Sequence, residues 1–257
     1  MGGKTVGGRA VGKAGIIESR APVGIGESDP ESAHIFITRA AEQSAPIMFA
    51  DLTYECLEEH PHGTLQRYTL RRIDTGNIQH IELDLLGGFQ RKNLITARTA
   101  ISVLRRKTQL SISTKAILEG LRNVTALTGL SGRWQIISHV PLTIADGGHN
   151  AHSFKETVRQ LRKMEHDRLY MILGFAADKT LDTIFPQLPA DAEYIFTQSS
   201  SPRAISADRL AEEAKHYGLK GKVIADPHAA LEHAKSNAGP SDVIFVGGSL
   251  YLVGEIL

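Results

Sequence analysis

Residues 146–150, with the sequence Asp-Gly-Gly-His-Asn, place an acid, two glycines, an imidazole and an amide within five positions. The apolar residues 141–145 before them predict a strand, and residues 151–164 after them predict a helix. Ligands bind at the carboxyl ends of strands in open α/β sheets, so this turn is a candidate binding site. Asp146 could hold a cation or an amine, and His149 could face a phosphate or a carboxylate at the positive end of the helix. We expect both side chains to face solvent, and a purely structural turn is the alternative.

Further positions carry groups suited to charged ligands, each with a plainer explanation beside it. Lys13 lies among small residues and could equally be a surface lysine next to a turn. Arg133 follows a glycine and suits bidentate contact with phosphate, although such an arginine often pairs with a carboxylate. Ser249 and Tyr251 follow the last predicted strand, where the serine could instead cap a helix and the tyrosine could pack in the core. Arg203 lies in a predicted loop, where arginines are usually solvated.

The composition is that of a globular protein, and it excludes several kinds of site and partner. Charged residues make up 22% of the chain, but 29 basic and 28 acidic residues give a net charge of only +1, so no nucleic-acid partner is implied. The single cysteine, Cys56, excludes an internal disulfide and a cysteine-cluster metal site. No apolar run is long enough to span a bilayer, and residues 1–8 lack the apolar core of a signal peptide. We therefore expect a cytoplasmic protein with no membrane partner.

From residue 141 onward, apolar strands alternate with helices. The predicted strands cover residues 141–145, 168–174, 192–197, 222–225 and 242–246, and the predicted helices cover residues 151–164, 181–188, 206–217, the segment opened by Asp226-Pro227, and a short apolar end at 249–257. Nearly all-apolar strands separated by helices predict a parallel sheet that is covered on both faces. The carboxyl ends of such strands lie at one sheet edge, which would bring Asp146 and Ser249 together.

The first half of the chain is less regular. It predicts strands at 22–25 and 47–50, a helix from Asp29-Pro30 to about residue 44, a hairpin of 66–73 with 78–85, helices at 90–106 and 113–122, and a plausible hinge at 128–132. Asn93 falls in the polar first turn of its helix, where a solvated turn is the plain explanation. His60 and His62 flank Pro61 but lack convincing ligand spacing, so we expect a solvated loop there rather than a metal site.

Six motifs are more informative together than singly, because of the order in which they occur. They are Lys-Ala-Gly-Ile-Ile at 13–17, Gly-Phe-Gln-Arg-Lys-Asn at 88–93, Gly-Arg at 132–133, Asp-Gly-Gly-His-Asn at 146–150, Ser-Pro-Arg-Ala at 201–204, and Gly-Ser-Leu-Tyr-Leu-Val-Gly-Glu at 248–255. This series resembles the folylpolyglutamate synthases of the Mur ligase superfamily, which in bacteria are often also dihydrofolate synthases. The resemblance covers essentially the whole chain. It implies an α/β fold, with a C-terminal Rossmann-like parallel-sheet domain preceded by the remainder of a P-loop-type α/β ATPase domain.

The resemblance also implies a reaction, in which ATP and Mg²⁺ serve to join L-glutamate to a folate or dihydropteroate carboxyl group. ATP phosphorylates the carboxylate, the glutamate amine attacks the resulting acyl phosphate, and the tetrahedral intermediate expels phosphate. The activation is needed because a carboxylate is a poor electrophile, and cations must neutralise the transferring phosphoryl group. The implied partners are small-molecule substrates, and the complete protein is expected to be a monomer.

Three residues match the nucleotide and metal side of the family's site. Lys13 matches a lysine that the family carbamylates, which turns an ammonium into a carboxylate-like ligand for Mg²⁺, a cation that prefers oxygen. Asn93 matches a nucleotide-binding asparagine of the ATPase domain. Arg133 matches the hinge arginine that reaches the ATP phosphates. On this basis we expect Lys13 to be a catalytic and metal-binding residue, and Asn93 and Arg133 to bind ATP.

The other matches lie towards the end of the chain. Asp146 and His149 match a catalytic pair that faces the nucleotide and the incoming glutamate. Ser249 and Tyr251 match positions near the glutamate pocket, which His149 also contacts. Arg203 matches a loop arginine of the family less closely.

The chain also departs from the family. A phosphate-binding loop of the Gly-Thr-x-Gly-Lys-Gly-Ser type is absent, and Gly12 stands where the family usually has glutamate. We therefore expect residues 1–127 to be the C-terminal remainder of the ATP-binding central domain, 128–134 a hinge, and 135–257 the glutamate ligase domain. The isolated chain should then be incompetent in catalysis. The alternatives are another Mur-type amino-acid ligase, or a non-catalytic remnant or binding module.

Overall fold

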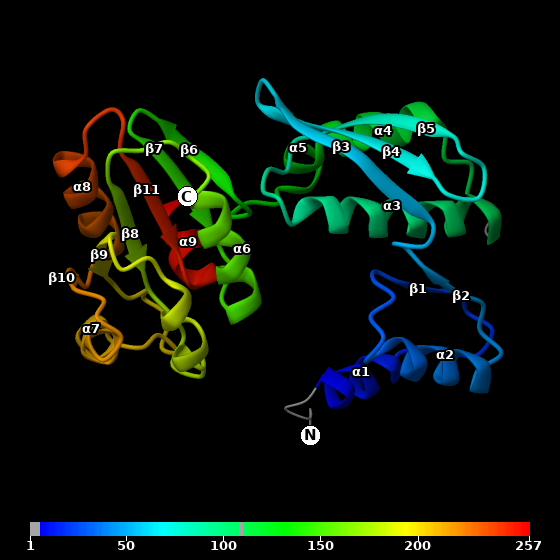
Figure 1. Ribbon diagram of the computed structural model, residues 1–257, viewed down its shortest axis with the longest axis horizontal. Helices are drawn as coiled ribbons and strands as arrows, with labels where there is room; N and C mark the ends of the chain where they lie inside the picture. Colours follow the sequence, from blue (N-terminus) through cyan, green and yellow to red (C-terminus); the bar gives the residue numbers. More distant parts are fainter. Residues whose placement is uncertain (1–5, 108–109) are drawn as a thin grey trace. The chain divides into compact units, whose positions relative to one another are not determined.

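The computed structural model describes residues 6–107 and 110–257 (Figure 1). The described chain divides into two compact units. Unit 1 comprises the chain up to Asp84 together with Phe89–Leu127, and unit 2 comprises Leu85–Gly88 together with Thr128–Leu257. Residues 1–5 of the predicted ATP-binding remainder lie outside the described residues. The correspondence of these units to an ATPase remainder and a ligase domain stays a prediction.

Unit 2 is built on a six-stranded sheet in the order β10-β9-β8-β11-β7-β6. The strands are β6 Gln135–His139, β7 Leu142–Asp146, β8 Leu169–Leu173, β9 Glu193–Phe196, β10 Gly221–Val223 and β11 Val243–Gly247. All neighbours are parallel except β6, which pairs antiparallel with β7. Because β11 returns between β7 and β8, Asp146 and Leu173 both pair with Gly247. The carboxyl ends of these three strands therefore meet at one place.

Helices cover both faces of this sheet, as the apolar strands predict. They are α6 Ala151–Leu161, α7 Ala207–Lys215, α8 Pro227–Asn237 and α9 Leu250–Ile256. Alternate residues of β11 point to opposite faces, so Ile244 and Val246 pack in a buried cluster with α8 and α9. Phe245 faces the other way and meets Phe154 of α6 with 6.5 Å between ring centroids. The predicted helix start at Asp226 is confirmed, because its carboxylate accepts a hydrogen bond from the Ala229 amide at 2.7 Å.

Two expectations for this unit are wrong. Residues 181–188 do not form one helix but two short 3₁₀ turns, Leu181–Thr183 and Phe185–Gln187. Pro186 explains this, because a proline disfavours helical geometry in the residue before it and cannot donate to the preceding turn. The strand β6 lies upstream of the first predicted strand and pairs with only one neighbour. Its residues are only partly buried, which weakens the apolar signal that would have revealed it.

Unit 1 contains two small sheets. Its elements are α1 Val6–Ala14, β1 Val23–Ile25, α2 Ala33–Glu42, β2 Ile47–Phe49, β3 Tyr54–His62, β4 Leu65–Arg72, β5 Ile78–Leu83, α3 Gln90–Lys107, α4 Thr114–Arg122 and α5 Val124–Thr128. The strands β1 and β2 pair in parallel, and β3, β4 and β5 form an antiparallel sheet. The strands, the hairpin and three of the helices follow the sequence patterns, whereas α1, α5 and β3 were not predicted.

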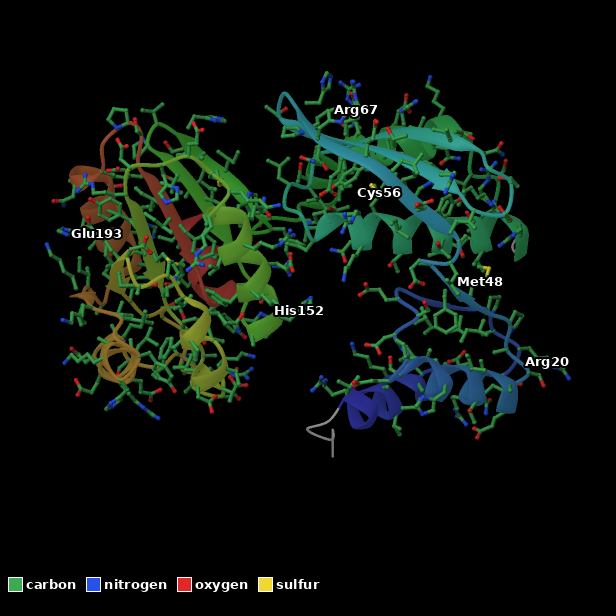
Figure 2. All side chains as sticks on the ribbon, viewed as in Figure 1. Arg20, Met48, Cys56, Arg67, His152 and Glu193 are labelled. Atoms are coloured by element: carbon green, nitrogen blue, oxygen red, sulfur yellow. The ribbon has the colours of Figure 1, made fainter. Side chains whose placement is uncertain are left out.

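The segment with two histidines is part of β3, not a solvated loop. Pro61 pairs with Gln66 of β4 on the outer strand of the sheet, where a missing backbone N–H costs no ladder hydrogen bond. Cys56 of the same strand and Arg67 of β4 mark this sheet in Figure 2. Among the described residues, no three histidine, cysteine or acidic side chains are arranged to hold a metal ion. Nor does the described chain contain a helix that is both long and apolar enough to cross a membrane.

Asp242, at the amino end of β11, is a structural anchor whose effect should depend on pH. Its carboxylate accepts hydrogen bonds from the Gly239 amide at 2.7 Å, from the Arg168 amide at 3.0 Å and from the Arg168 guanidinium at 2.8 Å. Burial alone would raise the pKa of Asp242, but these donors outweigh it and lower the pKa. The carboxylate therefore stabilises the folded chain above the pKa of the unfolded chain, about 3.9, and this contribution is lost as the pH falls through the lower native value.

We expect Asp242→Asn to lower the free energy of unfolding by about 1–3 kcal/mol at pH 7, because one acceptor becomes a donor that faces an N–H group. The difference from the parent chain should shrink as the pH falls below about 4. Urea unfolding at pH 7 and at lower pH measures this difference in the free energy of unfolding. Substitution of the exposed Asp191 by asparagine is the control. A difference that persists unchanged in acid would contradict the ionised role of Asp242.

Candidate functional site

A pocket of about 170 Å³ lies in unit 2 at the carboxyl ends of its strands. It is lined by His149, Ala176, Asp178, Lys179, Arg203, Gly248, Ser249, Leu250 and Tyr251. The lining comes from the segments that follow β7, β8, β9 and β11. Figure 2 draws the side chains of this unit, with His152 of α6 labelled near the turn that leads from β7. Four residues predicted from the sequence thus share one pocket.

Asp146 does not face solvent, which corrects the expectation for this residue. It is only 3% exposed, and both carboxylate oxygens are engaged by backbone groups. The Trp134 amide donates to Oδ2 and the Gly148 amide donates to Oδ1, each at 2.8 Å. Burial raises the pKa of Asp146, and the two amides oppose that shift. Asp146 therefore ties two turns of the site together, whatever else it contacts.

His149 is half-buried at the pocket, and its ring orientation is fixed by its own turn. Its Nδ1 lies 3.1 Å from the carbonyl oxygen of Gly147. A carbonyl only accepts, so Nδ1 must carry the hydrogen, which leaves Nε2 of a neutral ring free to accept a proton or a hydrogen bond. The next residue, Asn150, caps α6 by accepting a hydrogen bond from the Ser153 amide at 3.0 Å. The amide of this motif is thus a helix cap.

Arg133 lies in a turn that touches the motif after β7. The Gly147 amide donates to the Gly132 carbonyl at 2.9 Å. A side chain on Gly147 would begin 2.9 Å from Nη1 of Arg133 and 2.2 Å from a methyl carbon of Leu250, so both side chains would have to move to admit it. Within the described part of the chain Arg133 forms no close ion pair, but its charge acts on the nearby Asp146 carboxylate and lowers the pKa of that group. Its guanidinium is half-buried and retains unused donors.

The two predicted hydroxyls have different surroundings. Ser249 is buried, and its oxygen accepts a hydrogen bond from the Tyr251 amide at 3.1 Å, so it caps α9 as the plainer explanation has it. Tyr251 is 52% exposed and lines the pocket rather than packing in the core. The start of α9 therefore forms one wall of the pocket.

Asp178 and Lys179 also line the pocket and were not predicted. Arg203 donates through Nη2 to Asp178 at 3.2 Å, and its carbonyl accepts from the Ala177 amide at 2.8 Å. These contacts join the segments after β8 and β9 and place Arg203 at the pocket, while its side chain stays exposed to solvent as expected of a loop arginine. The signal that could have found Asp178 and Lys179 is their position in the segment that follows the buried strand β8, and the same signal indicates Asp146 and Ser249.

Lys13 and Asn93 belong to unit 1. Lys13 is exposed in the last turn of α1, and Gly12 beside it has open space where a side chain would begin. Asn93 is exposed in the first turn of α3 and donates to Oε1 of Gln90 at 2.9 Å. Neither residue lies in the pocket of unit 2, and their predicted roles stay predictions.

Comparison with known proteins shows which proteins this chain resembles. Residues 132–250 match the model of the Mur ligase glutamate ligase domain, and they contain most of the pocket. The folylpolyglutamate synthase of Lacticaseibacillus casei is 27% identical over 99% of the chain, and the dihydrofolate synthase/folylpolyglutamate synthase of Bacillus subtilis is 25% identical over 95%. The chain is a homologue of the folylpolyglutamate synthases. It spans 57% and 56% of the length of these two relatives.

Solved structures support the same fold. The Mycobacterium tuberculosis folylpolyglutamate synthase complexed with ADP superposes with a TM-score of 0.85 at 22% identity, covering 99% of this chain and 59% of that one. The bifunctional enzyme of Yersinia pestis complexed with AMPPNP and a Mn ion gives a TM-score of 0.76 at 24% identity, covering 96% and 55%. These likenesses confirm the predicted α/β architecture with its largely parallel sheet.

Proposed function

We propose that this chain is part of an ATP-dependent ligase that joins L-glutamate to the carboxyl group of folate or dihydropteroate. The observation that carries the proposal is the pocket in unit 2, which brings His149, Arg203 and Tyr251 together in a region most of which matches the glutamate ligase domain. The names of the relatives support the substrates, and the nucleotides named with the solved structures support ATP.

The pocket suits an amino acid with two carboxylates. The guanidinium of Arg203 and the ammonium of Lys179 can neutralise carboxylates, and the arginine can do so with two parallel hydrogen bonds. The free Nε2 of His149 can hold the substrate amine or take its proton as the amine attacks an acyl phosphate. Tyr251 offers a hydroxyl at the exposed wall. These groups would orient the nucleophile, and the acyl phosphate would provide the leaving group.

The ATP side of the reaction is assigned to three further residues. Arg133 has donors free to contact phosphate, and Asn93 is accessible to a nucleotide. Lys13 is exposed, so CO₂ can reach its amine, and a carbamate there would supply oxygen ligands to Mg²⁺, which polarises the transferring phosphoryl group. Gly12 supplies no carboxylate, so the carbamate would have to do so. Asp146 is a poorer metal ligand, because both oxygens already accept hydrogen bonds.

We further propose that the complete ligase works as a cytoplasmic monomer on small-molecule substrates, and that this chain alone does not complete the reaction. The phosphate-binding loop expected of the family has no counterpart in the sequence, which supports the second point. Release of ADP by the purified chain with ATP, Mg²⁺, folate and L-glutamate would contradict it.

Binding of L-glutamate tests the proposal without requiring catalysis. We expect L-glutamate at one hundred times its Kd to stabilise the chain by about 2.7 kcal/mol, because only the folded pocket binds it. Arg203→Ala should abolish this shift while the thermal midpoint of the free chain changes little, because Arg203 is exposed. D-glutamate is the control, since it has the same charges in mirror-image geometry. A folded chain that is stabilised by neither L-glutamate nor ATP would instead indicate a non-catalytic binding module.

A second ligase remains a candidate. A UDP-N-acetylmuramoyl-L-alanyl-D-glutamate–2,6-diaminopimelate ligase from Alkalilimnicola ehrlichii is 24% identical over 65% of the chain. Its name supports 2,6-diaminopimelate as the competing amino acid. Stabilisation by 2,6-diaminopimelate and not by L-glutamate would favour this candidate.

A further inference from the structure

Glu255 of α9 has no role in the proposed reaction, yet its carboxylate accepts hydrogen bonds from another segment. Its Oε1 accepts two hydrogen bonds from Ser200, one from the amide and one from the hydroxyl, each at 2.8 Å. Glu255 is half-buried, and hydrogen bonds to a charged acceptor are stronger than those between neutral groups. A single carboxylate oxygen thus fixes both the backbone and the side chain of Ser200.

Ser200 lies in the segment that presents Arg203 to the pocket. Within this segment, the Arg203 amide donates to the Ser201 hydroxyl at 3.3 Å, and the Ala204 amide donates to the Ser201 carbonyl at 2.9 Å. The turn that carries Arg203 therefore begins immediately after the residue that Glu255 holds. Movement of Ser200 would move the base of this turn.

The same helix also lines the pocket. The first turn of α9 carries Tyr251 and is capped by Ser249, while Glu255 reaches Ser200 from its last turn. The packing of α9 does not depend on Glu255, because Leu252 and Val253 are at most 1% exposed and anchor the helix in the core. The helix thus lines the pocket through Tyr251 and, through Glu255, holds the segment that carries Arg203.

We propose that Glu255 is a positioning residue that sets the separation between Arg203 and the His149 side of the pocket. This inference rests on the proposed function, because the separation matters for a ligand that presents a carboxylate to the arginine and an amine to the imidazole. An amino-acid substrate has both groups at a fixed distance. Loosening Ser200 would then weaken binding without removing any group that touches the substrate.

The test compares Glu255→Ala and Glu255→Gln with the parent chain, using L-glutamate as the ligand. We expect Glu255→Ala to raise the Kd for L-glutamate about tenfold, which is the effect of about 1.4 kcal/mol, and to speed hydrogen exchange at the Ser200 amide. Glu255→Gln keeps the acceptor oxygen and should restore most of the affinity. The thermal midpoint should change little, because the apolar anchors of α9 remain. Glu232→Ala on α8, which removes an exposed Lys235 ion pair, is the matched control.

The outcomes separate the two proposals. Unchanged exchange at Ser200, or an unchanged Kd in Glu255→Ala, overturns the positioning role while leaving L-glutamate binding in place. A loss of affinity that follows a large fall in the thermal midpoint and is not restored by glutamine would show that Glu255 is only structural, and this also overturns it. A parent chain that does not bind L-glutamate overturns the proposed function, and the positioning role falls with it.

Discussion

Asp146→Ala should destabilise unit 2 severely, because it leaves two backbone amides without their acceptor. The Trp134 and Gly148 amides donate to the two oxygens of this carboxylate, and the residue is 3% exposed. An unsatisfied buried donor costs about 1–3 kcal/mol, so for the two amides we expect a loss of roughly 2–6 kcal/mol in the free energy of unfolding. Trp134 also has a positive φ of 46°, a conformation that a tryptophan keeps only when its surroundings hold it.

Urea unfolding measures this loss, with the fluorescence of Trp134, the single tryptophan, as the signal. His149→Ala is the control from the same motif. His149 is half-buried and bonds only to its own turn, so its removal should lower L-glutamate affinity more than stability. Equal unfolding midpoints for Asp146→Ala and the parent chain would contradict the anchoring role.

The ionisation of Asp146 changes the stability of the chain with pH in the opposite direction to the ionisation of Asp242. Burial raises the pKa of Asp146, so the folded chain binds this proton more tightly than the unfolded chain does. Ionisation of Asp146 therefore costs stability as the pH rises from about 3.9 through the higher native value. The carboxylate is nevertheless needed, because only two acceptor oxygens satisfy both amides.

The sequence predicts most of unit 2 because its local and global signals agree. The strands β8 and β11 are buried along their whole length and stand out as apolar runs between capped helices. The predictions of elements fail where the local and global signals in the sequence conflict. Residues 181–188 have a helical apolar pattern that Pro186 interrupts, and β3 carries charged residues because one of its edges has no strand partner.

The position of the site follows from the sequence better than the function of each side chain does. Parallel strands place residues 146–150 and 248–251 at one sheet edge, and the pocket forms there. Pattern alone cannot tell that the Asp146 carboxylate bonds to its own backbone, because that depends on the Arg133 turn folding back by twelve residues. The reach of Glu255 to Ser200 is likewise invisible, since fifty-five residues separate them.

Gly248→Ala should be the other substitution with a large effect. Gly248 has a φ of +104°, which side-chain-bearing residues rarely adopt. A side chain there would begin 2.7 Å from the Gly174 carbonyl oxygen and 3.0 Å from the Phe175 ring, and both neighbours are fixed by the core. Backbone strain of about 1–3 kcal/mol adds to about 1–3 kcal/mol of overpacking, so we expect a total loss of roughly 2–6 kcal/mol.

The same change should also damage the pocket, because Gly248 connects β11 to the capping residue Ser249. Displacing this turn moves Tyr251 as well, so L-glutamate affinity should fall together with the thermal midpoint. Gly254→Ala is the matched control on α9, because nothing lies within 4 Å of the added carbon and alanine favours a helix over glycine by about 0.5–1 kcal/mol. Gly254→Ala should thus raise the thermal midpoint slightly, whereas Gly248→Ala should lower it. If both alanines are tolerated alike, the turn after β11 can relax, and its glycine is not what shapes the pocket.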